Sequence, residues 1–105
     1  MEDGNFISNI AIVGLGLIGG SYAMALRQKT SGKIFGIDID ERVLEKAVCC
    51  GVIDQGSTDV HEILSKSEIV ILALYPRDAI EFIKNNSKNF KPGTVITDTC
   101  VSKSQ

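Results

Sequence analysis

The sequence predicts a doubly wound α/β domain, in which a parallel sheet lies between two layers of helices. Two continuous apolar runs, residues 10–13 and 69–74, are typical of strands buried on both faces. Apolar residues at helical spacing follow these and other short runs, so strands and helices alternate along the chain. Such alternation gives right-handed crossovers and helices on both faces of one sheet. The 105 residues suffice for one domain of this kind and are too few for two.

The first half of the chain predicts two strands, each followed by a helix. The strands are expected over residues 10–13 and 33–38, and the helices over residues 17–28 and 41–49. Asp40 suits the N-cap of the second helix, and Gly51 suits its end. The apolar stripe of this helix consists of Val43, Leu44, Ala47 and Val48.

The second half predicts three more strands, over residues 52–53, 68–74 and 94–97, and two helices. One helix begins at Asp59, because Asp59 and Glu62 have the spacing of a capping box. The other begins at Pro76, a residue that suits a first helical turn. Its apolar face is expected to contain Ile80, Phe82 and Ile83. The predicted sheet order is 3-2-1-4-5, with the switch point between strands 1 and 4.

Charge and hydropathy exclude several classes of partner. The 11 basic and 13 acidic residues give a net charge of -2, so the electrostatics do not favour nucleic acid or an anionic membrane. The longest apolar stretch, residues 10–18, is shorter than the roughly 20 residues of a membrane-spanning helix. Glu2 and Asp3 stand where a signal peptide would be basic. We therefore expect a cytoplasmic protein without a nucleic-acid or membrane partner.

The three cysteines, Cys49, Cys50 and Cys100, do not form a recognisable metal or redox pattern. They lack CxxC spacing, and no histidine is near them in the sequence. We interpret all three as reduced thiols that pack as small apolar side chains, and we expect no metal.

The string Gly14-Leu-Gly16-Leu-Ile-Gly19 fits the pattern G-x-G-x-x-G of dinucleotide-binding turns. It follows a predicted strand directly and opens a predicted helix, the context in which this pattern is informative. Gly14 would allow the sharp turn, Gly16 the close approach of a pyrophosphate, and Gly19 the packing of helix against strand. Free N–H groups at the helix start, where Leu17 and Ile18 lie, would stabilise phosphate charge without a lysine.

Asp38 lies 19 residues after Gly19, where this pattern has an acid at the end of the second strand. Its carboxylate would accept hydrogen bonds from the adenosine ribose and would repel a 2'-phosphate, so NAD is favoured over NADP. Arg42 is close enough in sequence to accommodate the phosphate of NADP instead. Two other interpretations stay open: the glycines and Asp38 serve only packing and helix capping, or the turn holds FAD.

The residues around the turn resemble the prephenate dehydrogenases. Gly14-Leu-Gly-Leu-Ile-Gly-Gly-Ser21 is similar to the opening of that family, and three more stretches agree with it: Gly36-Ile-Asp38, Gly51-Val-Ile-Asp-Gln-Gly56 and Leu74-Tyr-Pro76. The resemblance covers essentially the whole chain. It implies the NAD-binding Rossmann domain of a homodimeric enzyme that oxidatively decarboxylates prephenate, or arogenate in close relatives, in tyrosine biosynthesis.

The resemblance also implies positions near the cofactor. The family's loop after strand 4 passes the nicotinamide, which corresponds here to Leu74, Tyr75 and Pro76. The loop after strand 5 contributes Thr99 and Cys100. The family's catalytic histidine and its helical substrate and dimerisation domain come later than residue 105. We therefore expect one domain over residues 1–105, no catalytic residue within it, and a solvated surface position for His61.

Two alternatives to this family stay open. One is another oxidoreductase of the 6-phosphogluconate-dehydrogenase-like group, such as a hydroxyacid dehydrogenase or a pyrroline-carboxylate reductase. Leu17-Ile18 followed by Gly20-Ser21 favours prephenate dehydrogenase over that group. The other alternative is a non-catalytic nucleotide-sensing module with the same fold.

Overall fold

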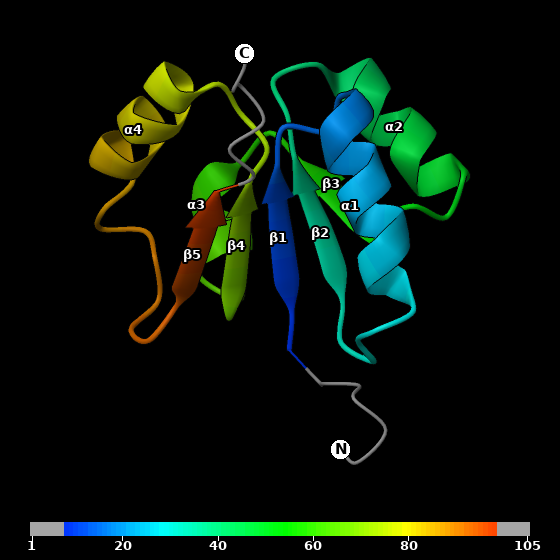
Figure 1. The fold of residues 1–105 in the computed structure, drawn as a ribbon, viewed down its shortest axis with the longest axis horizontal. Coiled ribbons are helices and arrows are strands. Elements are labelled where there is room, and N and C mark those ends of the chain that lie inside the picture. Colours follow the sequence, from blue (N-terminus) through cyan, green and yellow to red (C-terminus); the bar gives the residue numbers. More distant parts are fainter. Residues whose placement is uncertain (1–7, 99–105) are drawn as a thin grey trace.

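The structure, a computed structural model, describes residues 8–98 of the chain. Strands and helices alternate through this range (Figure 1). In chain order the elements are β1 (Ile10–Val13), α1 (Leu17–Arg27), β2 (Ile34–Ile37), α2 (Glu41–Cys49), β3 (Gln55–Ser57), α3 (Val60–Leu64), β4 (Ile69–Leu72), α4 (Pro76–Asn85) and β5 (Val95–Asp98). No helix in the described range is long and apolar enough to cross a membrane.

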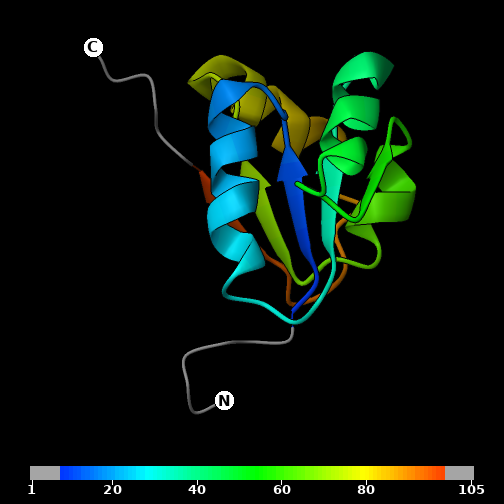
Figure 2. The ribbon, with the colours of Figure 1, turned by 90° about the vertical axis from the view of Figure 1, so that its right-hand side faces the viewer.

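The five strands form one parallel sheet in the predicted order, β3-β2-β1-β4-β5. At the carboxyl end of the central strand, Val13 pairs with Ile37 of β2 and with Leu72 of β4. Helices α1 and α2 cover one face of the sheet, and α3 and α4 cover the other (Figures 1 and 2). The strand order reverses between β1 and β4, and ligands of doubly wound sheets bind beside the carboxyl ends at such a point.

Side chains of strand β1 belong to both hydrophobic cores, one on each face of the sheet. Ile10 and Ile12 belong to the core beneath α1 and α2, whereas Ala11 and Val13 belong to the core beneath α3 and α4. All four side chains are buried. A strand covered on both faces must be apolar at every position, which explains the continuous run in the sequence.

Helices α2, α3 and α4 begin at the positions that the sequence predicts for them. Asp40 accepts a hydrogen bond from the N–H of Arg42 at 3.0 Å at the start of α2. Asp59 accepts one from the N–H of Glu62 at 3.3 Å at the start of α3. Pro76 is the first residue of α4, where a missing N–H leaves no helical hydrogen bond unmade.

The prediction of a third strand over residues 52–53 is wrong, because β3 is the polar segment Gln55–Ser57 at the sheet edge. The N–H groups of Val52 and Ile53 instead donate to the carbonyl of Ala47, at 2.9 and 3.4 Å, and so close the end of α2. The side chain of Ile53 is buried in the core beneath α1 and α2. This apolar pair therefore fills the core without joining the sheet.

Parts of the predicted helix faces are also corrected. In α4, Ile80 is 58% exposed and Ile83 is exposed as well, whereas Ala79 is buried and Phe82 packs against the core. Helix α4 therefore packs on the core through Ala79 and Phe82, and the two isoleucines lie on its exposed side. In α2, Val48 is exposed although it belongs to the predicted stripe.

The expectation that the cysteines pack in the interior is wrong for two of them. Cys49 and Cys50 are free and exposed at the end of α2. Helix α2 buries the side that carries Leu44, so its last residues point away from the core. Cys100 lies outside the described residues.

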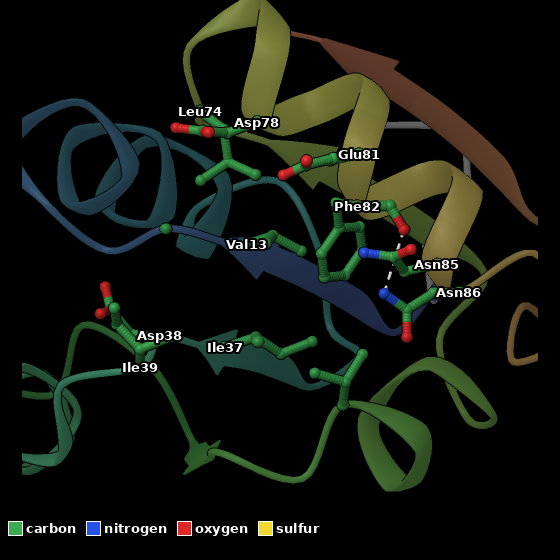
Figure 3. Close-up of a pocket in the computed structure, with 12 residues that line it drawn as sticks. Val13, Ile37, Asp38, Ile39, Leu74, Asp78, Glu81, Phe82, Asn85 and Asn86 are labelled. Atoms are coloured by element: carbon green, nitrogen blue, oxygen red, sulfur yellow. Dashed lines mark hydrogen bonds between the residues drawn. The ribbon is translucent and has the colours of Figure 1, made fainter.

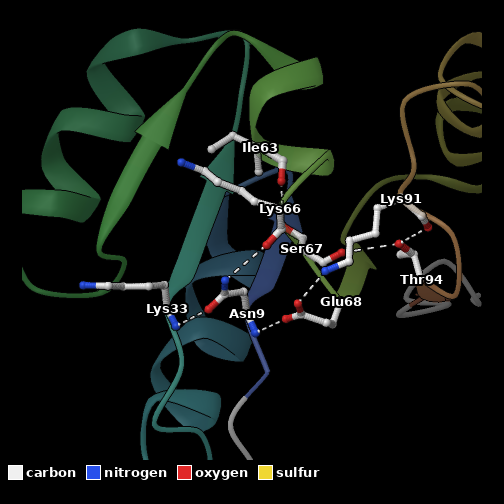
Figure 4. A network of polar contacts seen from close by, with 8 residues as sticks. All are labelled: Asn9, Lys33, Ile63, Lys66, Ser67, Glu68, Lys91 and Thr94. Carbon is white, nitrogen blue, oxygen red and sulfur yellow. Dashed lines mark hydrogen bonds and ion pairs between the residues drawn. The ribbon is translucent and has the colours of Figure 1, made fainter.

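A polar network connects the segments that precede four of the strands (Figure 4). Asn9 donates its side-chain amide to the carbonyl of Lys66 at 3.2 Å, and its Oδ1 accepts the N–H of Lys33 at 2.9 Å. Glu68 accepts the N–H of Asn9 at 2.6 Å and the ammonium of Lys91 at 2.7 Å. Hydrogen bonds from Lys91 and Asn9 hold the pKa of the Glu68 carboxyl below its ordinary value. The network thus fixes the amino-terminal ends of the strands, opposite the edge where the glycine turn lies.

Candidate functional site

The glycine turn joins β1 to α1 at the carboxyl edge of the sheet. Gly14 has a φ of +88°, in the left-handed region that favours glycine, and its N–H donates to the carbonyl of Ile37 at 2.8 Å. A Cβ added at Gly19 would overlap the carbonyl oxygen of Gly14. Both glycines are therefore required by the conformation and packing of the turn.

Gly16 has a different environment from the other two glycines. It is the N-cap of α1 and provides no side-chain cap, and apart from its two chain neighbours none of the described residues lies within 4 Å of a Cβ built there. The backbone of Leu17 and Ile18 follows as the first turn of α1, where N–H groups have no acceptor within the helix. These donors and the positive end of the helix dipole make the open space at Gly16 suitable for an anionic group.

The carboxylate of Asp38 is held by the backbone on both oxygens. Oδ2 accepts the N–H of Leu15, in the middle of the glycine turn, at 2.9 Å. Oδ1 accepts the N–H of Asp40 at 3.0 Å. Because Asp40 caps α2, Asp38 is not the cap of that helix. Carboxylate oxygens have more than one lone pair each, so Asp38 retains capacity for hydrogen bonds from a ligand's hydroxyl groups.

The segment after β4 lies against the glycine turn. Strand pairing ends two residues earlier than predicted, and Ala73 then donates its N–H to the carbonyl of Val13 at 2.9 Å. A Cβ on Gly14 would meet the Ala73 carbonyl and the Leu74 side chain, so the two loops are in direct contact. The other two residues of the predicted nicotinamide loop open helix α4, as the exposed N-cap Tyr75 and the first residue Pro76.

A cavity of about 570 Å³ lies beside this edge, between α4 and the loop after β2 (Figure 3). Its volume falls in the range of roughly 300–1,000 Å³ that is usual for small-molecule sites. The cavity brings together three residues of the predicted site, Gly14, Asp38 and Leu74. Several further lining residues were not predicted, among them Ile39, Val60, Asp78, Glu81, Phe82 and Asn85.

The lining residues that α4 contributes to the cavity were not predicted from the sequence. Asp78, Glu81 and Asn85 are spaced three and four residues apart, which places them on one side of α4. The signal that could have identified them is this spacing in a helix that starts beside the carboxyl end of a strand. Ile39 is 98% exposed although it is apolar, and its position directly after Asp38 is a second such signal.

Arg42 contacts Asp40, and among the described residues it forms no ion pair with Asp38. Its Nε lies 3.5 Å from Oδ1 of Asp40, and its side chain is 89% exposed. In the described part of the chain no basic side chain forms an ion pair with Asp38. The carboxylate of Asp38 would therefore repel a phosphate group brought close to it.

The structure describes only some of the remaining predicted positions. Thr99 and Cys100 lie outside the described residues. His61 is exposed on α3, as expected, with Nδ1 2.9 Å from Oδ1 of Asn89. Within residues 8–98, no three histidine, cysteine or acidic side chains are arranged to hold a metal ion.

Comparisons with known proteins identify relatives of this chain. The chain matches the family described as prephenate dehydrogenase, nucleotide-binding domain, over residues 22–105. It is similar to the prephenate dehydrogenase of Bacillus subtilis (strain 168), with 40% identity over 65 residues, which are 61% of this chain and 18% of that protein.

Two solved structures resemble the chain closely. One is the prephenate dehydrogenase of Aquifex aeolicus in complex with hydroxyphenyl propionate and NAD+, with a TM-score of 0.79, 35% identity and coverage of 88% of this chain. The other is the arogenate dehydrogenase of Synechocystis, with a TM-score of 0.79, 26% identity and coverage of 90%. The chain spans about a third of these two proteins, 33% and 35% of their respective lengths.

Proposed function

Because the chain belongs to the prephenate dehydrogenase family, whose nucleotide-binding domain it matches, we propose that residues 1–105 bind NAD for the oxidative decarboxylation of prephenate. The observation that carries the proposal is the contact between Asp38 and the glycine turn. It puts an acid suited to ribose hydroxyls beside an open helix start suited to a pyrophosphate.

Each part of the site has a proposed role in binding. Gly16 leaves space for the pyrophosphate, and the first-turn N–H groups of α1 donate to it. Asp38 accepts the ribose hydroxyls, and the neighbouring cavity receives the adenine. Leu74 lines the cavity assigned to the adenine, and Tyr75, Pro76, Thr99 and Cys100 are proposed as neighbours of the nicotinamide.

NAD is favoured over NADP by the charges at this edge. Asp38 has no basic partner among the described residues, and Arg42 pairs with Asp40. A 2'-phosphate would therefore meet an uncompensated carboxylate. The relative from Aquifex aeolicus was solved with NAD+, which supports the same choice.

When bound, NAD supplies a hydride acceptor for the ring carbon that bears the substrate hydroxyl. The contribution of these 105 residues is to orient the cofactor, because the proposal assigns no catalytic base to them. His61, the only histidine, lies on α3 in contact with Asn89. The base, the substrate walls and the homodimer contacts are assigned to other parts of the enzyme, in keeping with the greater length of the relatives.

Family membership favours this reading over the hydroxyacid dehydrogenase, pyrroline-carboxylate reductase and nucleotide-sensing alternatives. A solved prephenate dehydrogenase and a solved arogenate dehydrogenase both resemble the chain. A cytoplasmic location and a homodimeric enzyme stay predictions.

Calorimetric titration of the protein with NAD, AMP and NADP tests the proposal. We expect NAD and AMP to bind, with NADP weaker than NAD, because most of the proposed contacts are with the adenosine half of the cofactor. AMP would compete with NAD for one site. Absence of binding by both NAD and AMP would contradict the proposed function.

A further inference from the structure

The cavity beside Asp38 has a polar rim on two sides and an apolar interior. Asp38 lies at one side, after β2, and Glu81 lies at the other, on α4 (Figure 3). Between them, Val13, Ile37 and Phe82 form apolar parts of the lining. A flat, largely apolar ring with a polar edge is the kind of group that such a space accommodates.

Glu81 reaches from α4 toward this space. Figure 3 shows its carboxylate directed between Leu74 and Phe82, over Val13. Among the described residues, no hydrogen-bond donor or basic side chain pairs with the carboxylates of Glu81 or Asp78. These acids do not belong to a metal cluster within residues 8–98 either. The acceptor capacity of Glu81 is thus available to a ligand.

We infer that Glu81 is a specificity-determining residue that accepts a hydrogen bond from the exocyclic amino group of the adenine ring. The inference rests on the proposed function, since it requires the ribose of NAD to lie at Asp38. A ribose at Asp38 directs the base into the cavity, toward the wall formed by α4.

The chemistry of the carboxylate makes Glu81 selective. An ionised carboxylate accepts hydrogen bonds and cannot donate one. It therefore suits the amino group at C6 of adenine and opposes the carbonyl oxygen at C6 of hypoxanthine. Asn85, one turn further along α4, presents both a donor and an acceptor, so it does not distinguish the two bases.

The test compares NAD with nicotinamide hypoxanthine dinucleotide, which differs only at C6 of the purine and in the adjacent N1 proton. Each is titrated calorimetrically into the wild-type protein and into Glu81→Gln and Asp78→Asn. Asp78→Asn is the matched control, because it neutralises an acid that lines the same cavity one turn earlier. Glu81 and Asp78 are both exposed, so both variants are expected to fold, which thermal unfolding checks.

We expect wild-type protein to prefer NAD by about tenfold or more, the effect of a hydrogen bond to a charged group. Glu81→Gln should reduce or reverse the preference, because its amide can donate to the C6 carbonyl, while Asp78→Asn should keep it. Equal binding of the two dinucleotides by wild-type protein would overturn the inference. A preference unchanged in Glu81→Gln, or lost in Asp78→Asn instead, would overturn it as well.

These outcomes are separate from failure of the proposed function. If NAD does not bind to wild-type protein at all, the NAD site itself is wrong, and the role of Glu81 falls with it. If NAD binds and the purine base makes no difference, the NAD site stands and only the role of Glu81 is wrong.

Discussion

The Oδ2 atom of Asp38 accepts a hydrogen bond from the backbone N–H of Leu15 at 2.9 Å, which connects the end of β2 to the middle of the glycine turn. The other oxygen accepts the N–H of Asp40 at 3.0 Å. Both contacts come from the backbone, so the carboxylate is held in place by the fold itself. Such preorganisation lowers the entropy lost when a ligand binds.

Replacement of Asp38 by alanine should weaken NAD binding by about 1–3 kcal/mol, because ribose hydroxyls would lose a charged acceptor. NADP should lose less affinity than NAD, since its phosphate is no longer repelled. Calorimetric titration with both dinucleotides measures the two effects. Asp40→Asn, which removes a charge two residues away and keeps a capping side chain, should bind NAD nearly as wild type does. NAD affinity unchanged in Asp38→Ala would assign the ribose contact to another residue.

Gly16→Ala should separate binding from folding. Apart from its two chain neighbours, no described residue lies within 4 Å of a Cβ at this position, so the melting temperature should change little. The same methyl group occupies space proposed for the pyrophosphate, so NAD affinity should fall at least tenfold, since about 1.4 kcal/mol corresponds to that factor. Thermal unfolding and titration of one preparation give both values. Wild-type affinity in this variant would show that the pyrophosphate does not approach Gly16.

Gly19→Ala and Gly20→Ala form a matched pair in the same helix. The added methyl at Gly19 would overlap the carbonyl of Gly14, whereas at Gly20 it meets no described residue within 4 Å. We expect Gly19→Ala to lower the free energy of unfolding by about 1–3 kcal/mol through overpacking. Gly20→Ala should raise it by roughly 0.5–1 kcal/mol, the helical advantage of alanine over glycine. Denaturant unfolding measures both, and equal stabilities would mean that the turn relaxes around the methyl group.

Glu68 should make the stability of the fold depend on acid pH. Its pKa is lowered in the folded protein by the hydrogen bonds from Lys91 and Asn9. The stabilisation is therefore complete above the ordinary pKa of 4.5 and is lost as the pH falls through the lower, folded pKa. Glu68→Gln should cost up to about 1 kcal/mol at neutral pH, because the pair with Lys91 is partly exposed. The difference from wild type should disappear in strong acid.

Unfolding midpoints measured from pH 7 to pH 2 test this dependence. Glu62→Gln is the control, since Glu62 has a looser contact with Lys66, at 3.9 Å on the surface of α3. Part of the acid sensitivity should persist in both variants because of Asp54. Burial alone would raise the pKa of Asp54, but the Ile34 N–H and the Arg27 guanidinium outweigh it and hold the pKa below its ordinary value. A constant difference between Glu68→Gln and wild type across this range would contradict the role given to Glu68.

The elements that were predicted correctly have strong local signals. The strand β1 is apolar at every position because it lies between two cores, and Asp40 and Asp59 cap helices through contacts two or three residues away. The edge strand β3 has no such signal. It pairs through backbone groups of a polar segment, while the neighbouring apolar residue Ile53 serves the core.

The candidate site likewise contains residues that the sequence predicted and residues that it did not. The glycine turn and Asp38 follow a spacing that is visible in the sequence, and the structure brings them into contact. The wall contributed by Asp78, Glu81 and Asn85 could not be assigned without knowing which side of α4 faces the sheet. That orientation depends on Ala79 and Phe82, and the sequence pattern identified Phe82 but placed Ile80 and Ile83 on the buried face in place of Ala79.

By itself, the sequence determined the alternation of strands and helices, the strand order, the glycine turn and the acid that follows it. These features depend on short-range patterns and on the constant handedness of the crossovers. The tertiary structure alone decided the rotation of α4 and the cavity beside Asp38. These depend on which of several competing side chains packs closest to the sheet, a choice made between segments distant in the chain.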